Sequence, residues 1–230
     1  MARLLVHVEG QTEETFVNEV LRSHLLHCGY ESVSARIVSN ARLRSRRGGI
    51  RPWPAVRKDI INHLRQDRGC IATTMVDFYA LPQEGEQAWP GRAAAVGASG
   101  HQKASGVEKA LRDDLAHEMG TSFNISRFLP FVVVHEFEGL LFSDCAAFAR
   151  GIDRPDLESN FSQIRESFAT PEEIDDSPFT APSKRVEDLV PGYDKPLLGT
   201  LAILEIGLDS IRAECPHFNS WLHQLESLAA

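Results

Sequence analysis

Acidic residues stand directly after three of the most apolar segments of this sequence, where their carboxylates could hold a cation. They are Glu9, Asp77 and the pair Glu136 and Glu138. Carboxylates that crowd together repel one another and raise each other's pKa. A divalent cation removes this conflict, and Mg²⁺ prefers a few carboxylates together with water and substrate phosphate. These acids are therefore candidate ligands for Mg²⁺, with Mn²⁺ as the alternative ion.

The elements that must position these acids are four segments with the length and composition of β-strands, at residues 3–8, 32–38, 70–76 and 128–134. Segments of helical periodicity separate them, and Thr12 is the expected N-cap of the first helix. Strands that alternate with helices predict a mainly parallel, Rossmann-like α/β sheet. Ligands bind outside the carboxyl ends of the strands in such sheets, so we expect all the acids at one edge.

The last third of the chain predicts helices in place of strands. After residue 145 the β pattern ends, residues 178–196 form a Pro-rich connection, and Pro216 opens a last helix. A helical stripe is formed by Leu197, Leu201, Leu204 and Leu208. We therefore expect an α/β core at residues 1–145 and a helical C-terminal extension at residues 146–230 that packs on this core.

The composition is that of a globular protein, but its charge is unevenly distributed. The 230 residues are 43% hydrophobic and carry a net charge of −8. Residues 36–68 contain ten basic and two acidic residues, so this segment carries +8 and the remainder −16. A cationic patch on an acidic protein steers a polyanion toward one face. The expected phosphate contacts to nucleic acid lie in a loop and are Arg42, Arg44, Arg46 and Arg47.

Other classes of protein are not supported. No run approaches the roughly 18 apolar residues that a membrane span needs, and Glu9 comes too early for the apolar region of a signal peptide. The four cysteines lie far apart without a C-x-x-C pair, which argues against a disulfide framework or paired zinc ligands. We expect free thiols, no membrane partner and a cytoplasmic location.

Six short motifs, spread over almost the whole chain, resemble one known family. They are VEGQTE at 8–13, VDFYALP at 76–82, HEFEGLLF at 135–142, APSKR at 181–185, PGYDK at 191–195 and CPHFN at 215–219. The first resembles the start of Toprim domains, in the branch that includes the OLD-family nucleases. The ordered set is more similar still to a bacterial family of Toprim-like proteins of unknown function, often encoded beside an ATPase.

This resemblance implies roles for particular residues. Toprim proteins place a Glu after the first strand and an Asp-x-Asp after a later one, where they bind Mg²⁺ for phosphodiester cleavage or transfer. By resemblance, Glu9 is a catalytic and metal-site carboxylate, and Asp77 is the first Asp of the pair. Position 79 is Tyr here, so one ligand of the pattern is missing, and Glu136 or Glu138 would replace it.

The Pro-rich connection supplies candidate cations for the same chemistry. Lys195 and the phenol of Tyr193 could meet a phosphate and stabilise negative charge in a transition state, so we take Lys195 as a catalytic candidate. Lys184 and Arg185 are candidate nucleic-acid contacts. The alternative is a solvated loop whose basic side chains cover the core with their aliphatic stems.

The leading hypothesis is a metal-dependent phosphodiesterase, a nuclease of a bacterial defence or nucleic-acid-processing system with an ATPase partner. That biological role follows from the resemblance alone. The second hypothesis is a non-catalytic Toprim-like module that docks an ATPase or nucleic acid, which Tyr79 favours. A third is phosphotransfer on a small nucleotide, although no phosphate-binding loop is present. The sequence does not decide whether the protein forms a homo-oligomer. Convergence of the carboxylates within about 8 Å would favour a metal site.

The basic segment yields a first prediction. Changing Arg42, Arg44, Arg46 and Arg47 together to Ala should weaken nucleic-acid binding and flatten its dependence on salt, because fewer counterions are released. Fluorescence anisotropy with labelled DNA and RNA over a series of salt concentrations measures both effects. An unchanged salt slope would show that these arginines have another role, such as binding an acidic partner protein.

Overall fold

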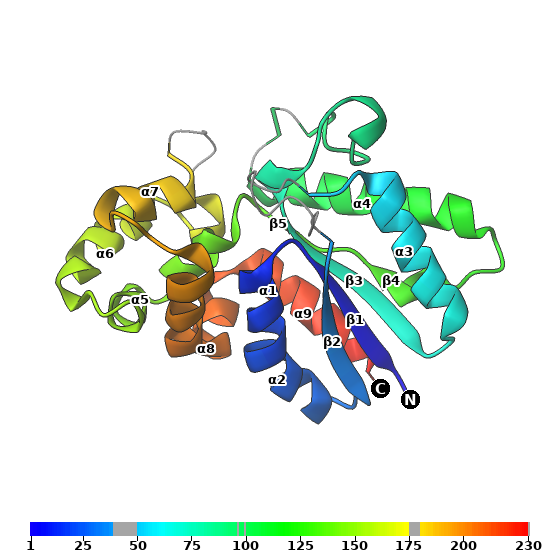
Figure 1. Ribbon diagram of the computed structural model, residues 1–230, viewed down its shortest axis with the longest axis horizontal. Coiled ribbons are helices and arrows are strands. Elements are labelled where there is room, and N and C mark those ends of the chain that lie inside the picture. The colour runs from blue at the N-terminus through cyan, green and yellow to red at the C-terminus, as the bar shows by residue number, and fades with distance from the viewer. Residues whose placement is uncertain (39–49, 96, 99, 175–179, 230) are drawn as a thin grey trace.

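A parallel β-sheet with helices on both faces forms the centre of the computed structural model (Figure 1). The structure describes residues 1–38, 50–95, 97–98, 100–174 and 180–229. The strands are β1 (Arg3–Val8), β2 (Ser32–Ile37), β3 (Cys70–Asp77), β4 (Phe128–Leu129) and β5 (Val132–Val133). They lie in the order β2-β1-β3-β4, with β5 also beside β3, and every pair is parallel. The predicted α/β fold with a mainly parallel sheet is confirmed.

The fourth predicted strand is divided into β4 and β5, and its sequence explains the break. Pro130 has no N–H to give to a sheet ladder. At Phe131, the hydroxyl of Thr74 on β3 replaces the ladder, because it accepts from the Phe131 N–H at 3.0 Å and donates to the Phe131 carbonyl at 2.8 Å. The strand therefore keeps its direction across the break, and Val133 lies opposite Asp77.

Helices cover the sheet in two layers. One face carries α3 (Trp53–Gln66) and α4 (Gly100–Met119), whose apolar residues form one hydrophobic cluster with β3. The other face carries α1 (Gln11–Phe16), the π-helix η1 (Val17–Leu21), α2 (Arg22–His27) and α9 (Pro216–Leu228). Beside these lie α5 (Cys145–Gly151), α6 (Glu158–Glu166), α7 (Pro182–Leu189), the π-helix η9 (Lys195–Gly199) and α8 (Thr200–Glu214). Short 3₁₀ turns include η3 (Phe78–Ala80), η5 (Ile125–Arg127) and η6 (Phe137–Ser143).

Three local predictions need correction. The first helix begins at Gln11 with Gly10 as its N-cap, because the Glu13 carboxylate accepts the Gly10 N–H at 2.9 Å; Thr12 therefore lies inside the helix. The expected connection at 178–196 contains the helix α7, which Pro182 opens. The leucine stripe begins in η9 and continues in α8, and it is largely exposed, while α8 packs through Ala202, Ile203 and Ile206 instead.

The C-terminal helices share a core with the sheet. The Trp221 ring of α9 stacks on Phe131 with ring centroids 4.4 Å apart, and its indole N–H donates to the buried Thr73 hydroxyl of β3 at 2.9 Å. One continuous hydrophobic cluster includes residues of β1, α1, α8 and α9. The proposed boundary between residues 145 and 146 therefore stays a prediction, and both parts depend on the same core.

Two further expectations can be compared with the described residues. None of their helices is long and apolar enough to cross a membrane. The four cysteines are free thiols, as expected from their spacing. The four arginines at positions 42, 44, 46 and 47 lie outside the described residues, so their role stays a prediction.

The contact between β3 and α9 yields a stability prediction. Thr73→Val keeps the shape of the side chain but leaves the Trp221 N–H and the Leu129 carbonyl without their buried partner. The free energy of unfolding should fall by about 1–3 kcal/mol, as measured by urea denaturation. Thr121→Val, at an exposed position, is the matched control and should change little. Trp221→Phe combined with Thr73→Val should cost less than the sum of the single changes, and strict additivity would contradict this account.

Candidate active site

Four carboxylates meet where the strands end. Glu9 follows β1, Asp77 ends β3, and Glu138 lies in η6 after β5, while Glu13 comes from the first turn of α1. Because these strands are parallel, their carboxyl ends meet at one edge of the sheet, as predicted. Glu13, Asp77 and Glu138 are buried, and Glu9 is half-buried. We call these four residues the acid cluster.

Lys195 at the start of η9 lies among these acids. Its ammonium is 2.9 Å from Glu138 Oε2, 3.4 Å from Asp77 Oδ2 and 3.9 Å from Glu13 Oε1. No two of these three oxygens can therefore be farther apart than 7.3 Å, the sum of the two longest distances, 3.4 and 3.9 Å. Lys195 is therefore not the solvated loop residue of the alternative interpretation. The expected convergence, which also involves Glu9, stays a prediction.

Backbone groups hold the carboxylates in place. The Asp77 N–H donates to Glu9 Oε2 at 3.3 Å, and the Phe137 N–H donates to Asp77 Oδ1 at 2.9 Å. Asp194 caps η9 by accepting the Leu197 N–H at 3.3 Å, which fixes the helix end that carries Lys195. The ends of β1, β3 and β5 are thereby linked through side chains of the acid cluster.

The acid cluster holds more carboxyl groups than its surroundings can stabilise in the charged form, so these groups keep their protons to a higher pH than ordinary acids. Burial raises the pKa of Asp77 and of Glu138 to about 7. The positive charge of Lys195 opposes this rise, and the neighbouring acids add to it. Burial also raises the pKa of Glu13, and burial together with repulsion from Asp77 and Glu13 raises that of Glu9 well above its ordinary value. Burial alone would lower the pKa of Lys195, but the surrounding carboxylates hold it well above the ordinary value.

The charge of the acid cluster suits a cation, although Lys195 fills the space between the oxygens. Glu138 Oε1 is buried and has no hydrogen-bond partner among the described residues, so one acceptor is open to a ligand. Within the same residues, no three of these carboxylates bring their oxygens all within 4.8 Å of one another. The donor set fits a hard cation such as Mg²⁺. Direct coordination would require Lys195 to move aside.

Three predicted site residues lie outside the contacts of Lys195. Glu136 accepts the Ser183 N–H at the start of α7, at 2.9 Å, and its charge helps to raise the pKa of Asp77 and of Glu138. Glu138 is the acid of this pair that contacts Lys195. Lys184 pairs with Glu187 at 2.5 Å. Arg185 donates to the Thr180 carbonyl and lies over the Phe168 ring. Neither Lys184 nor Arg185 has a recorded contact with the acid cluster.

Two aromatic residues border these acids. Tyr79, where the resemblance expects an Asp, donates its N–H to the His135 carbonyl at 3.3 Å and packs its ring against the His135 ring. The Tyr193 hydroxyl is buried, and both this burial and the repulsion from Glu138 raise its pKa. Tyr79 therefore adds no carboxylate to this edge of the sheet.

Glu13 is the member of the acid cluster that the sequence reasoning missed. It lies in the first turn of a predicted helix, where the helix N-terminus alone already accounts for an acidic residue. The available signal was its position in the motif VEGQTE, where one helical turn separates it from Glu9. Its carboxylate caps Gly10 and also approaches Lys195.

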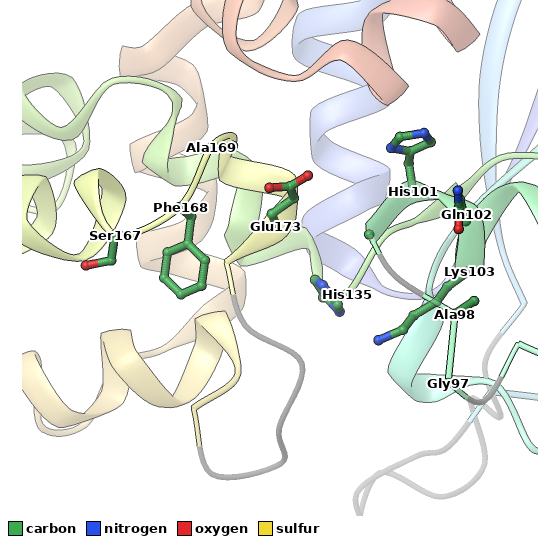
Figure 2. A pocket seen from close by; sticks show the side chains of 11 residues that line it. Gly97, Ala98, His101, Gln102, Lys103, His135, Ser167, Phe168, Ala169 and Glu173 are labelled. Carbon is green, nitrogen blue, oxygen red and sulfur yellow. The ribbon is translucent and has the colours of Figure 1, made fainter.

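A cavity of about 600 Å³ opens beside these elements. Figure 2 shows Phe168 and Glu173 on one side and His101 and Lys103 of α4 on the other, with His135 between them. His135 immediately precedes Glu136, so the cavity lies at the same edge of the sheet as the acid cluster. Its lining combines cationic, aromatic and acidic groups.

The fold and site define a class: an α/β protein with a parallel sheet and buried acids around one lysine at its carboxyl edge. Residues 8–226 match the family model described as Domain of unknown function (DUF4276), and the chain belongs to this family. The comparison with curated proteins gives no match, and neither does the comparison with solved structures.

The raised pKa values predict how stability depends on pH in a metal-free buffer. The ordinary pKa values of Asp77 and Glu138 are 3.8 and 4.5, and both are raised to about 7 in the fold. The stability that these groups contribute is therefore fully present below about pH 4 and lost as the pH rises through about 7. Urea unfolding from pH 4 to 8 should show this fall.

Lys195→Met should steepen that fall, because the carboxylates lose their nearest positive charge. Lys184→Met is the matched control, since Lys184 pairs with Glu187 on the surface, and it should leave the pH profile unchanged. A Lys195→Met profile that coincides with wild type would contradict the pairing described above.

Proposed function

We propose that this protein is a Mg²⁺-dependent phosphodiesterase, and that it acts as a nuclease. The observation that supports the proposal is the convergence of Glu9, Asp77 and Glu138 with Glu13 at the carboxyl edge of a parallel sheet. Structural acids are usually neutralised by matched cations, whereas Lys195 is the single basic residue recorded in contact with this cluster among the described residues. Four acids that face one ammonium favour a divalent cation, which would stabilise their charged forms.

Glu9, Asp77 and Glu138 are the residues that would hold Mg²⁺ or Mn²⁺, with Glu13 beside them. The bound ion would activate water and neutralise the scissile phosphate. Glu13 is also tied to the Gly10 N–H, which makes it better suited to orient its neighbours than to bind the ion alone. This division of roles follows from the contacts of each carboxylate.

Lys195 provides the second part of the proposed mechanism. Without the ion, its ammonium offsets the charges of Asp77 and Glu138. Once a divalent ion takes over that task, the same ammonium is available to the negative charge that develops on a phosphate during cleavage. The raised pKa of Lys195 keeps it protonated throughout the neutral range, so it would act by charge and not as a base.

The substrate assignment rests on the resemblance to Toprim-like nucleases and on the predicted basic loop. The cavity that His135 lines also contains Lys103 and the Phe168 ring, which suit a phosphate and a stacked base. A role in bacterial defence, together with an ATPase partner, is part of the proposal through the resemblance alone.

The second candidate is a non-catalytic module that docks an ATPase or nucleic acid. Tyr79 favours it, because the residue packs against His135 where the resemblance expects a metal-binding Asp. Glu136 does not fill that role, since its carboxylate is bound at the start of α7. In this alternative, Lys195 is a permanent counter-charge.

Substitution of Glu9 separates the two candidates. Glu9→Gln keeps the hydrogen-bonding reach but removes the charge, so Mg²⁺- or Mn²⁺-dependent cleavage of mixed DNA and RNA should fall at least about a hundredfold. Asp77→Asn should do the same, while Tyr79→Phe should matter less, because a neutral phenol is a poor Mg²⁺ ligand. If Glu9 only complemented a helix dipole, its loss would cost at most about 1 kcal/mol of stability and leave cleavage intact.

Glu14→Gln is the matched control, because Glu14 is an acid of the neighbouring helix α1 that does not contact Lys195 among the described residues. Circular dichroism should confirm that each variant is folded. Wild-type protein that stays inert on every substrate and with both metals, with and without a candidate ATPase, would favour the binding module.

A further inference from the structure

A second group of potential metal ligands lies between α2 and α9, at the amino-end edge of the sheet near both termini (Figure 1). His24 lies in α2, Cys28 is the C-cap of the same helix one turn later, and Glu226 comes from α9. One ligand atom from each of the three lies within 4.8 Å of the other two. In the described parts of the chain, this is the one group of three or more His, Cys, Asp or Glu residues that meets this distance.

The two helix ends that carry this group are held together independently of it. The buried Tyr30 hydroxyl, two residues after Cys28, donates to the Leu225 carbonyl of α9 at 2.8 Å. At Gly29 the backbone of α9 comes so close that an added Cβ would lie 3.3 Å from the Ala229 carbonyl oxygen. The three ligand side chains therefore face one another across a fixed contact, which lowers the entropy lost when they bind an ion.

The donor types select one class of ion. A thiolate and an imidazole are ligands for zinc and neighbouring transition metals, while Mg²⁺ prefers oxygen. We propose that His24, Cys28 and Glu226 form a binding site for a divalent ion of the zinc class, which fastens α9 to α2. On binding, the Cys28 thiol loses its proton to solvent and forms the metal–sulfur bond, and His24 binds as the neutral imidazole.

Arg212 of α8 occupies this site in the described state. Its Nη1 donates to Glu226 Oε1 at 2.6 Å and lies 3.3 Å from His24 Nε2, which itself is 2.6 Å from the same carboxylate oxygen. Arg212 thus supplies the positive charge that the ion would supply, and the ion must displace it. Arg212 also bonds Asn219 Oδ1 at 3.0 Å, so it keeps a partner after displacement.

A further neighbour, His223, supports the carboxylate. His223 Nδ1 lies 2.9 Å from Glu226 Oε2, the oxygen that does not contact His24. Such an outer partner orients a ligating carboxylate, and its loss typically weakens metal binding by about 10–100-fold. We expect that loss for His223→Ala.

Cobalt is the first probe, because Co²⁺ bound to a thiolate gives a near-ultraviolet charge-transfer band. The full chain, stripped of metal by a chelator, should give this band with one equivalent of Co²⁺, and Zn²⁺ should abolish it by displacement. Cys28→Ala and His24→Asn should lose the band. Cys145→Ala is the matched control, because Cys145 is also a partly buried free thiol, and it should keep the band.

Glu9→Gln should likewise keep the band, which makes this site testable whether or not the protein cleaves nucleic acid. In case a variant does not fold, alkylation of the wild-type protein provides a second measurement. Zn²⁺ should slow the alkylation of Cys28 and leave the alkylation rate of Cys145 unchanged. Absence of the band in wild type, or a band that survives in Cys28→Ala, would overturn the proposal, as would equal alkylation of Cys28 with and without Zn²⁺.

The position of Arg212 gives the sharpest comparison. Arg212→Gln removes the competing charge but keeps a side chain that can reach Asn219, so Zn²⁺ affinity should rise about tenfold or more. If Arg212 were only an ion-pair partner of Glu226, the variant would bind Zn²⁺ no better than wild type, and the competition argued here would be wrong.

Discussion

The buried carboxylates of the acid cluster must be compensated by hydrogen bonds and opposite charge, and the arrangement of the C-terminal helices depends on this requirement. Carboxylates are costly to bury, and their cost falls only when hydrogen bonds and opposite charges accompany them. The backbone N–H groups of Gly10, Asp77 and Phe137 supply the hydrogen bonds. The opposite charge comes from Lys195, 118 residues beyond Asp77. The C-terminal helices therefore do more than enlarge the core, because they carry Lys195, the one ammonium that contacts these acids among the described residues.

The approach of Lys195 requires close packing between η9 and α1. Gly199 ends η9, and a Cβ at this position would lie 2.9 Å from the Tyr193 hydroxyl and 3.4 Å from Thr12 Cγ2. Because Gly199 has no side chain, η9 can pack against α1, while Asp194 caps the N-terminal end of η9. A π-helical turn shifts the side chains that follow it relative to an α-helix, and such turns are frequent at functional sites. Here the turn begins with Lys195 itself.

The sequence was sufficient to predict the sheet and the ends of its strands. Strand-length apolar runs that end in acids placed Glu9 and Asp77 at one edge, because parallel strands leave no other arrangement. It was not sufficient to choose between Glu136 and Glu138, since that choice depends on how η6 turns after β5. Lys195 was a candidate only through its residue type and motif, because periodicity carries no information about contacts across more than a hundred residues. Glu13 was missed because helix capping explained it equally well.

Both clusters described here use a basic residue of the C-terminal helices as their resident cation. Lys195 offsets the oxygen ligands at the carboxyl edge, and Arg212 offsets Glu226 at the amino edge. A cation that entered either proposed site would have to compete with a tethered charge, which would favour divalent over monovalent ions. The two clusters then differ in chemistry, because one offers only oxygen and the other adds sulfur and nitrogen. Under the two proposals, selectivity would have two steps: the resident cation would set the charge that an ion must have, and the donor atoms would decide which divalent ion binds.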